Sequence, residues 1–124
     1  MKIAIVEDDI NMRKSLEIAM GDYEKYDVHT FKNARDALKK LDDTFELIIS
    51  DINMPGMNGW QCLEELKQDP RFEKIPVLMY STSSYSGDAE KAIKLGALCF
   101  FTKPSDYNLL KEILKTIADN IGGD

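Results

Sequence analysis

Short apolar runs alternate along the chain with segments whose apolar residues recur every three or four positions. The runs are rich in β-branched residues and have the length of buried strands, whereas the spacing between them is that of one helix face. The expected strands are residues 2–6, 26–31, 45–50, 75–80 and 97–102, and the expected helices are residues 10–21, 34–41, 59–67, 87–95 and 106–121.

Residues that favour helix starts and stops lie at the borders of several of these segments. Asn33 and Ser105 are expected to cap the second and the last helix, because their side-chain oxygens can accept hydrogen bonds from amides of the first turn. The first helix is expected to stop at Gly21. Its expected apolar face consists of Ile10, Leu16, Ile18 and Met20.

Strict alternation of strands and helices predicts a parallel sheet with right-handed crossovers and helices on both faces. The expected fold is therefore α/β, a doubly wound five-stranded parallel sheet with five helices in three layers. In such a sheet, loops at the carboxyl ends of neighbouring strands meet, and binding sites form where they do.

Composition narrows the class of protein. The 124 residues, 44% hydrophobic and 31% charged, are typical of one globular domain, residues 1–124. No apolar run approaches a membrane span, and acidic residues follow the first strand too soon for a signal peptide, so a cytoplasmic location is expected. The net charge is −6 and neither half is basic, so direct nucleic-acid binding is not expected. Output is expected to pass through a protein partner.

Polar residues gather at four expected strand ends. Glu7, Asp8 and Asp9 follow the first strand and Asp51 the third. Each has an ordinary explanation alone, such as helix capping or a turn. The last two ends carry Ser81, Thr82 and Lys103. Convergence of three carboxylates, a hydroxyl and an amine at one edge favours a site over these separate explanations.

Close carboxylates repel each other by about 4 kcal/mol per pair at 4 Å and an effective dielectric of 20. One lysine could not offset three acids, whereas a divalent cation could. Oxygen ligands without histidine or thiolate favour Mg²⁺, or Mn²⁺ in its place. Asp51 is then a candidate nucleophile for a phosphoryl group, with Lys103 and the Ser81 hydroxyl contacting phosphoryl oxygens and the Asn53 backbone carbonyl completing the metal shell.

Four segments in this order and spacing resemble the receiver domain of two-component response regulators, over essentially the whole chain: IAIVEDD, LIISDINMPGMNGW, IPVLMYSTS and GALCFFTKPSD. The resemblance implies the flavodoxin-like, chemotaxis-regulator-like fold with strand order 2-1-3-4-5. It implies a phosphoacceptor rather than an enzyme acting on outside substrates.

The resemblance also implies roles for individual residues. Asp51 matches the phosphoacceptor, Asp8 a direct Mg²⁺ ligand, and Glu7 an acid that acts through water. Asn53 matches the residue that lends its carbonyl. Ser81 matches the switch hydroxyl, and Phe100 matches the aromatic switch residue. Lys103 matches a lysine whose peptide bond to the following proline, here Pro104, is cis.

Three positions depart from the commonest family pattern. Thr82 stands where most receivers have alanine or glycine, and its β-branched side chain is expected to slow attack of water on the phosphoryl group. Phe100 lacks the hydroxyl of a tyrosine, which favours a buried ring even without phosphate. Asp9 is an additional acid, and capping is its expected role rather than metal contact.

The resemblance implies a stand-alone response regulator in a phosphorelay, phosphorylated by a sensor histidine kinase or a histidine phosphotransfer protein. Its downstream protein target is expected on the face formed by the fourth helix, fifth strand and last helix. A monomer or a phosphorylation-linked dimer is expected.

Rival interpretations fit the residues less well. A Ca²⁺ loop beginning at Asp51 would need a glutamate at its twelfth position, where Cys62 stands. An aspartate-nucleophile phosphatase would need an acid where Asn53 lies, and a flavin phosphate would be repelled by residues 7–9. His29, the one histidine, is expected on the solvent side of an edge strand.

Overall fold

Five parallel strands form one sheet in the computed structural model, which describes residues 1–21, 26–82 and 87–121. Their bounds are β1 (Lys2–Val6), β2 (Asp27–Phe31), β3 (Leu47–Asp51), β4 (Val77–Ser81) and β5 (Cys99–Thr102). The strand order is β2-β1-β3-β4-β5, and all four pairings are parallel. The predicted fold class and strand order are confirmed.

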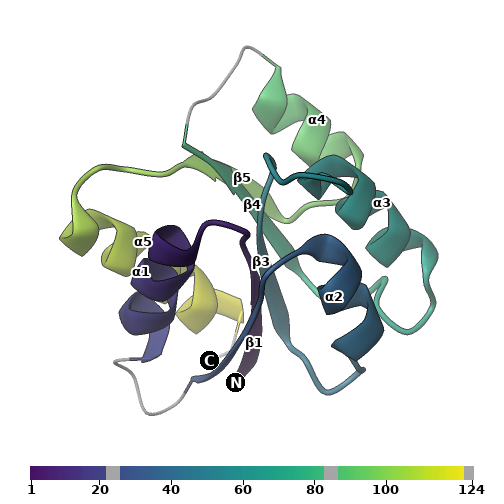
Figure 1. Cartoon of the computed structure of the whole chain (residues 1–124), viewed down its shortest axis with the longest axis horizontal. Helices are drawn as coiled ribbons and strands as arrows, with labels where there is room; N and C mark the ends of the chain where they lie inside the picture. The colour runs from purple at the N-terminus through teal and green to yellow at the C-terminus, as the bar shows by residue number, and fades with distance from the viewer. Residues whose placement is uncertain (22–25, 83–86, 122–124) are drawn as a thin grey trace.

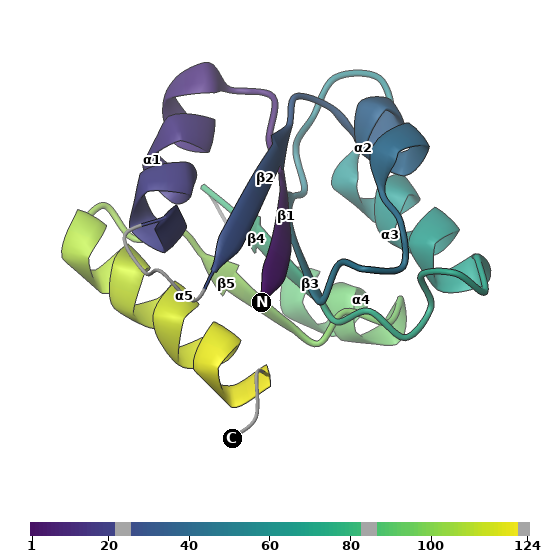
Figure 2. The same ribbon diagram turned by 90° about the horizontal axis from the view of Figure 1, so that it is seen from below.

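Helices cover both faces of the sheet, and Figure 2 shows the three layers edge-on, with α1 and α5 on one side and α2, α3 and α4 on the other. Figure 1 shows that the loops that follow β1 and β3 leave the sheet at the same end, as parallel pairing requires. The helices are α1 (Ile10–Gly21), α2 (Ala34–Lys40), α3 (Gly59–Gln68), α4 (Asp88–Lys94) and α5 (Tyr107–Ile121). Within the described ranges no helix is long and apolar enough to cross a membrane.

Side chains along each strand alternate between two apolar cores, as the pleat requires. Ile3 and Ile5 of β1 pack into the core under α1 and α5, whereas Ala4 and Val6 pack into the core under α2, α3 and α4. The central strands are buried on both faces, which is why their sequences are apolar throughout. Removing these side chains from water provides the main favourable free energy of folding.

The buried face of α1 differs from the prediction. Met12, Leu16, Ala19 and Met20 are buried, whereas Ile10 and Ile18 are each more than half exposed. Leu16 and Met20 are four residues apart and share one face, while Ile18 lies about 200° around the helix from Leu16. Ile10 is the first residue of the helix.

Helix caps agree with the prediction at two of the three predicted positions, of which Asp9 is described with the site. The Asn33 side chain accepts a hydrogen bond from the Asp36 amide at 2.7 Å and caps α2 as predicted. At α5 the cap is Asp106 rather than Ser105, because the Asp106 carboxylate accepts from the Asn108 amide at 2.8 Å. The α3 cap was not predicted: Asn58 and Gln61 form a reciprocal capping box.

Strands β3 and β4 each extend one residue further than predicted, which matters for the site. Asp51 and Ser81 are the last residues of their strands rather than the first residues of the loops. In the sheet Asp51 is aligned with Tyr80, and Ser81 with Thr102. The segment between β4 and α4 includes residues 83–86, which lie outside the described part of the chain.

Candidate functional site

Three carboxylates meet at the carboxyl ends of β1 and β3. Glu7 and Asp8 directly follow β1 and Asp51 ends β3, so the parallel pairing of these strands brings them to one edge of the sheet. One oxygen of each lies within 4.8 Å of the others. Glu7 is 2% exposed and Asp51 7%, whereas Asp8 is exposed. They share a cavity of about 220 Å³ with Asp9, Met12, Asn53 and Thr82.

Glu7 is held by donors on both of its oxygens. The Tyr80 hydroxyl donates to Oε1, and the Asp9 amide donates to Oε2 at 3.0 Å. Burial raises the pKa of Glu7 to about 7, with smaller increases from the neighbouring Asp51 and Asp8, while the two hydrogen bonds act in the opposite direction. Burial and the adjacent Glu7 also raise the pKa of Tyr80.

Tyr80 is a site neighbour that was not predicted from the sequence. It lies in an apolar run with the spacing of a buried strand, and it is fully buried. Its ring stacks on Phe101 of β5 with the centroids 5.8 Å apart. A buried tyrosine hydroxyl needs a polar partner. The tyrosine at this position, one residue before Ser81, was therefore a sign in the sequence that the strand makes a polar contact near the site.

Asp51 is fixed by its own turn. The Asn53 amide donates to its Oδ1 at 3.3 Å, and the Ser50 hydroxyl donates to its backbone oxygen at 3.0 Å. Burial raises the pKa of the Asp51 carboxyl, and the turn amides oppose that shift. The start of α3 closes against the same backbone, since a Cβ on Gly59 would lie 2.2 Å from the Asp51 carbonyl oxygen.

Ser81 and Thr82 reach the same region from β4. Ser81 is buried, and the Asn53 side-chain amide donates to its Oγ at 3.4 Å. This side-chain contact of Asn53 was not predicted, since the prediction concerned only its backbone carbonyl. Thr82 is exposed and lines the cavity that contains Asp51.

Lys103 follows β5 beside Ser81, and its backbone amide donates to the Ser81 carbonyl at 2.8 Å. Within residues 1–21, 26–82 and 87–121 its ammonium forms no ion pair with the acids within 4.0 Å. The expected cis bond to Pro104 is wrong, because the described chain contains no cis peptide. The trans form is the intrinsically favoured isomer, by about 0.5–1 kcal/mol.

Asp9 caps α1, as expected. Its Oδ1 accepts hydrogen bonds from the Asn11 amide at 2.8 Å and the Met12 amide at 3.2 Å. Arg13, one turn into the helix, donates to the Glu7 carbonyl at 2.9 Å. The loop that carries the acids is therefore fastened to α1 at both its backbone and its side chains.

The two aromatic residues of β5 lie on opposite faces of the sheet. Phe100 is half-buried and packs against the core under α2, α3 and α4, whereas Phe101 packs against the core under α1 and α5. The half-buried ring of Phe100 is the one that the family resemblance assigns to the switch.

The three acids suit a hard divalent cation. Within the described residues no lysine or arginine lies within 4.0 Å of any of the three carboxylates, so in that part of the chain no cationic side chain offsets their repulsion. Glu7 and Asp51 are buried, so water cannot solvate their charges as well as a bound cation can. Carboxylate oxygens with an open side toward a cavity are ligands that Mg²⁺ prefers.

A second cavity of about 510 Å³ borders the site at Asp8. Its lining includes three exposed basic side chains from the β2–α2 region, namely Lys32, Arg35 and Lys39. Basic side chains therefore lie next to the acid cluster, although the protein as a whole has a net charge of −6.

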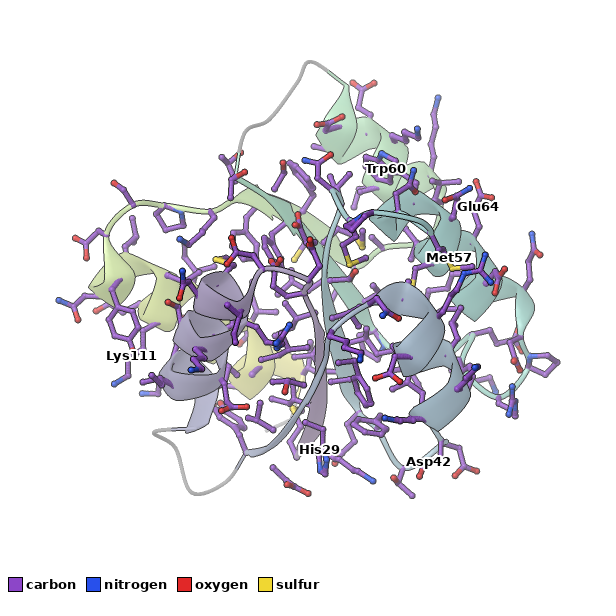
Figure 3. The ribbon with its side chains drawn as sticks, viewed as in Figure 1. His29, Asp42, Met57, Trp60, Glu64 and Lys111 are labelled. Carbon is purple, nitrogen blue, oxygen red and sulfur yellow. The ribbon has the colours of Figure 1, made fainter. Side chains whose placement is uncertain are left out.

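The histidine and the tryptophan lie outside this cluster, and Figure 3 labels both. His29 is partly exposed on the edge strand, as predicted, with its ring edge 5.4 Å from Phe45 and its Nε2 3.1 Å from Asp27. Trp60 lies on α3 beneath the ammonium of Lys91, 4.7 Å from the ring centre.

Comparison with known proteins identifies the class that this fold and site define. The family model for the response regulator receiver domain matches residues 3–115, so the chain belongs to that family of two-component signalling domains. Members of the family are signalling domains rather than classical enzymes.

Among curated relatives, the transcriptional regulatory protein FlgR of Helicobacter pylori is 46% identical over 90% of this chain and 28% of its own length. The chemotaxis protein CheY1 of the same species is 32% identical over 94% of this chain and 96% of its own. This chain thus spans about a quarter of the first relative and nearly all of the second.

Solved structures of similar proteins share the fold. The chemotaxis protein CheY4 of Vibrio cholerae has a TM-score of 0.80 at 28% identity, over 94% of this chain and 97% of that one. The phosphorylated cyanobacterial phytochrome response regulator RcpA has a TM-score of 0.86 at 27% identity, over 98% of this chain and 94% of that one.

Proposed function

We propose that this receiver domain accepts a phosphoryl group on Asp51 from a histidine kinase or a histidine phosphotransfer protein, in a Mg²⁺-dependent reaction. The observation that carries the proposal is the meeting of Glu7, Asp8 and Asp51 within 4.8 Å around a shared cavity. A structural acid cluster would be expected to pair with lysines or arginines, whereas this one faces open space.

Each residue of the site has a separate role in the phosphoryl transfer. A carboxylate oxygen of Asp51 attacks the phosphorus of a phosphohistidine, the P–N bond breaks, and the imidazole leaves, which gives an aspartyl phosphate. Asp8, Asp51 and the Asn53 carbonyl would hold the cation directly and Glu7 through water. Mg²⁺, or Mn²⁺, would supply positive charge for the phosphoryl oxygens.

Ser81 and Lys103 are proposed to act after the transfer. Both belong to the adjoining ends of β4 and β5, where the Lys103 amide already contacts the Ser81 carbonyl. A phosphoryl group on Asp51 would draw the Ser81 hydroxyl and the Lys103 ammonium toward its oxygens. The displaced Ser81 leaves space into which Phe100 can turn, a population shift between two packings.

The output surface is proposed to be the face formed by α4, β5 and α5. Four large apolar side chains are exposed on these elements and the turn between α4 and β5: Ile93, Leu98, Tyr107 and Leu109. Such side chains would suit the apolar part of a surface that binds a protein partner. Rotation of Phe100, which lies on β5, would alter this face directly.

The test is incubation with acetyl phosphate and Mg²⁺ followed by intact mass measurement. The wild-type protein is expected to gain one phosphoryl group, and Asp51→Asn none. Asp42→Asn serves as the matched control, because Asp42 (labelled in Figure 3) is an exposed carboxylate beside Lys2 at the amino end of β1, opposite the end where the acids lie. Its variant should gain the group normally. Failure of the wild type, or labelling of Asp51→Asn, would contradict the proposal.

Thr82 is proposed to set the lifetime of the aspartyl phosphate. Its exposed side chain lines the cavity that water must enter to attack the phosphorus. Thr82→Ala is expected to speed the loss of the phosphoryl group several-fold, measured as the decay of the phosphorylated mass after removal of the donor. An unchanged or slower decay would show that Thr82 does not restrict water.

A further inference from the structure

Tyr80 forms a buried hydrogen bond to Glu7 to which the proposed phosphoryl transfer assigns no role. Its hydroxyl donates to Glu7 Oε1 from the opposite side of the sheet from Phe100, and it is fully buried. The other Glu7 oxygen, Oε2, accepts from the Asp9 amide at 3.0 Å. Because each carboxylate oxygen has a donor, rotation of the Glu7 carboxylate would break at least one hydrogen bond.

The donor itself is fixed in place. The Tyr80 ring belongs to a central strand and stacks on Phe101 with an interplanar angle of 25° and centroids 5.8 Å apart. A buried aromatic ring on a central strand that packs against a neighbouring ring has little freedom to move. The hydroxyl therefore stays in one position, and it determines where the Glu7 carboxylate lies.

We propose that Tyr80 is a positioning residue for divalent-cation binding, which holds the Glu7 carboxylate so that its free lone pairs face Asp8 and Asp51. Tyr80 acts through Glu7 and does not contact the cation. The inference rests on the proposed metal-dependent function and adds a residue to it. Partners that orient a metal-binding carboxylate typically change metal affinity by 10–100-fold when they are removed.

The chain contains a matched control for the loss of one hydroxyl. The Tyr26 hydroxyl donates to Asp119 Oδ1, so it forms the same kind of tyrosine–carboxylate bond. Tyr26 is also buried, and it packs in the same core as Tyr80. It directly precedes β2, whose first residue, Asp27, is aligned with Lys2 at the amino end of β1, the end of the sheet opposite the acids. Tyr80→Phe and Tyr26→Phe thus remove identical groups, one at the acid site and one away from it.

The experiment is calorimetric titration of the wild-type protein and both variants with Mg²⁺. Tyr80→Phe is expected to raise the Kd for Mg²⁺ about tenfold, and Tyr26→Phe to leave it within about twofold. In the acetyl phosphate reaction, Tyr80→Phe should raise the half-saturating Mg²⁺ concentration by the same factor. The phosphorylation rate at saturating Mg²⁺ should stay within about twofold of wild type, since Tyr80 does not contact the phosphoryl group.

The outcomes separate this inference from the proposed function. If the wild type binds Mg²⁺ and Tyr80→Phe binds it equally well, Tyr80 is only a packing residue and the inference is overturned. If both tyrosine variants weaken binding equally, general loosening of the core is the cause and the inference also fails. If the wild type itself neither binds Mg²⁺ nor gains a phosphoryl group, the proposed function fails, and the inference with it.

Discussion

Gly59→Ala is expected to lower the free energy of unfolding by about 3 kcal/mol, the upper part of the usual range for overpacking a core. A Cβ at this position would lie 2.2 Å from the Asp51 carbonyl oxygen and 2.7 Å from the Ile52 Cα, distances that require the backbone to move. Neither neighbour is a flexible side-chain tip. The strain would fall on the turn that carries the proposed phosphoacceptor.

Urea unfolding of the wild type and the variant measures this effect. Gly21→Ala is the control, because a Cβ there would meet no atom of the described residues within 4 Å. The control is expected to change the unfolding free energy by less than about 0.5 kcal/mol, as surface changes usually do. A Gly59→Ala protein as stable as the control would mean that α3 can move away from β3 without cost.

The metal-free protein is expected to lose stability as the pH rises from about 4.5 to about 7, by at most about 3 kcal/mol from Glu7. Burial raises the pKa of Glu7 from 4.5 to about 7, so the native state holds a proton that the unfolded chain has already released. Below pH 4.5 both states are protonated and there is no penalty. Above pH 7 the native state has an ionised, buried carboxylate and the full penalty applies.

Chemical unfolding at several pH values, with a chelator present, tests this dependence. Glu7→Gln should flatten the curve between pH 4.5 and 7, because the amide does not ionise. Asp69→Asn should leave it unchanged, since the Arg71 side chain lowers the pKa of Asp69 instead. Mg²⁺ should oppose the loss above pH 7, because a cation binds the ionised carboxylate. A curve that Glu7→Gln does not flatten would rule out Glu7 as its origin.

The sequence predicted the sheet and the meeting of the acids because both follow from local pattern and chain topology. Alternating runs determine parallel pairing, and parallel pairing places Glu7, Asp8 and Asp51 at one edge regardless of side-chain detail. The family motifs then supplied the role of each residue. The mass measurement on Asp51→Asn tests the phosphoacceptor role, and the switch roles of Ser81 and Phe100 stay predictions.

What the pattern did not predict depends on contacts distant in sequence or on small shifts in register. Tyr80 and Glu7 are 73 positions apart, and nothing in an apolar strand indicates which acid its hydroxyl will meet. Ile10 and Ile18 are apolar residues that were predicted to face the core, but both are exposed on α1. The cap of α5 moved by one residue, from Ser105 to Asp106, a difference that propensity alone does not resolve because both residues are good caps.

The alternation of Phe100 and Phe101 along β5 has a consequence for how this domain transmits information. One ring borders the layer of α2, α3 and α4, and the other stacks on the ring of Tyr80, whose hydroxyl donates to Glu7. If Tyr80 positions Glu7 and Phe100 is the switch, ion affinity and the response to phosphorylation would depend on side chains packed in different layers of the molecule. Substitutions beside Phe101 would then be expected to change the affinity for the ion more than the packing around Phe100.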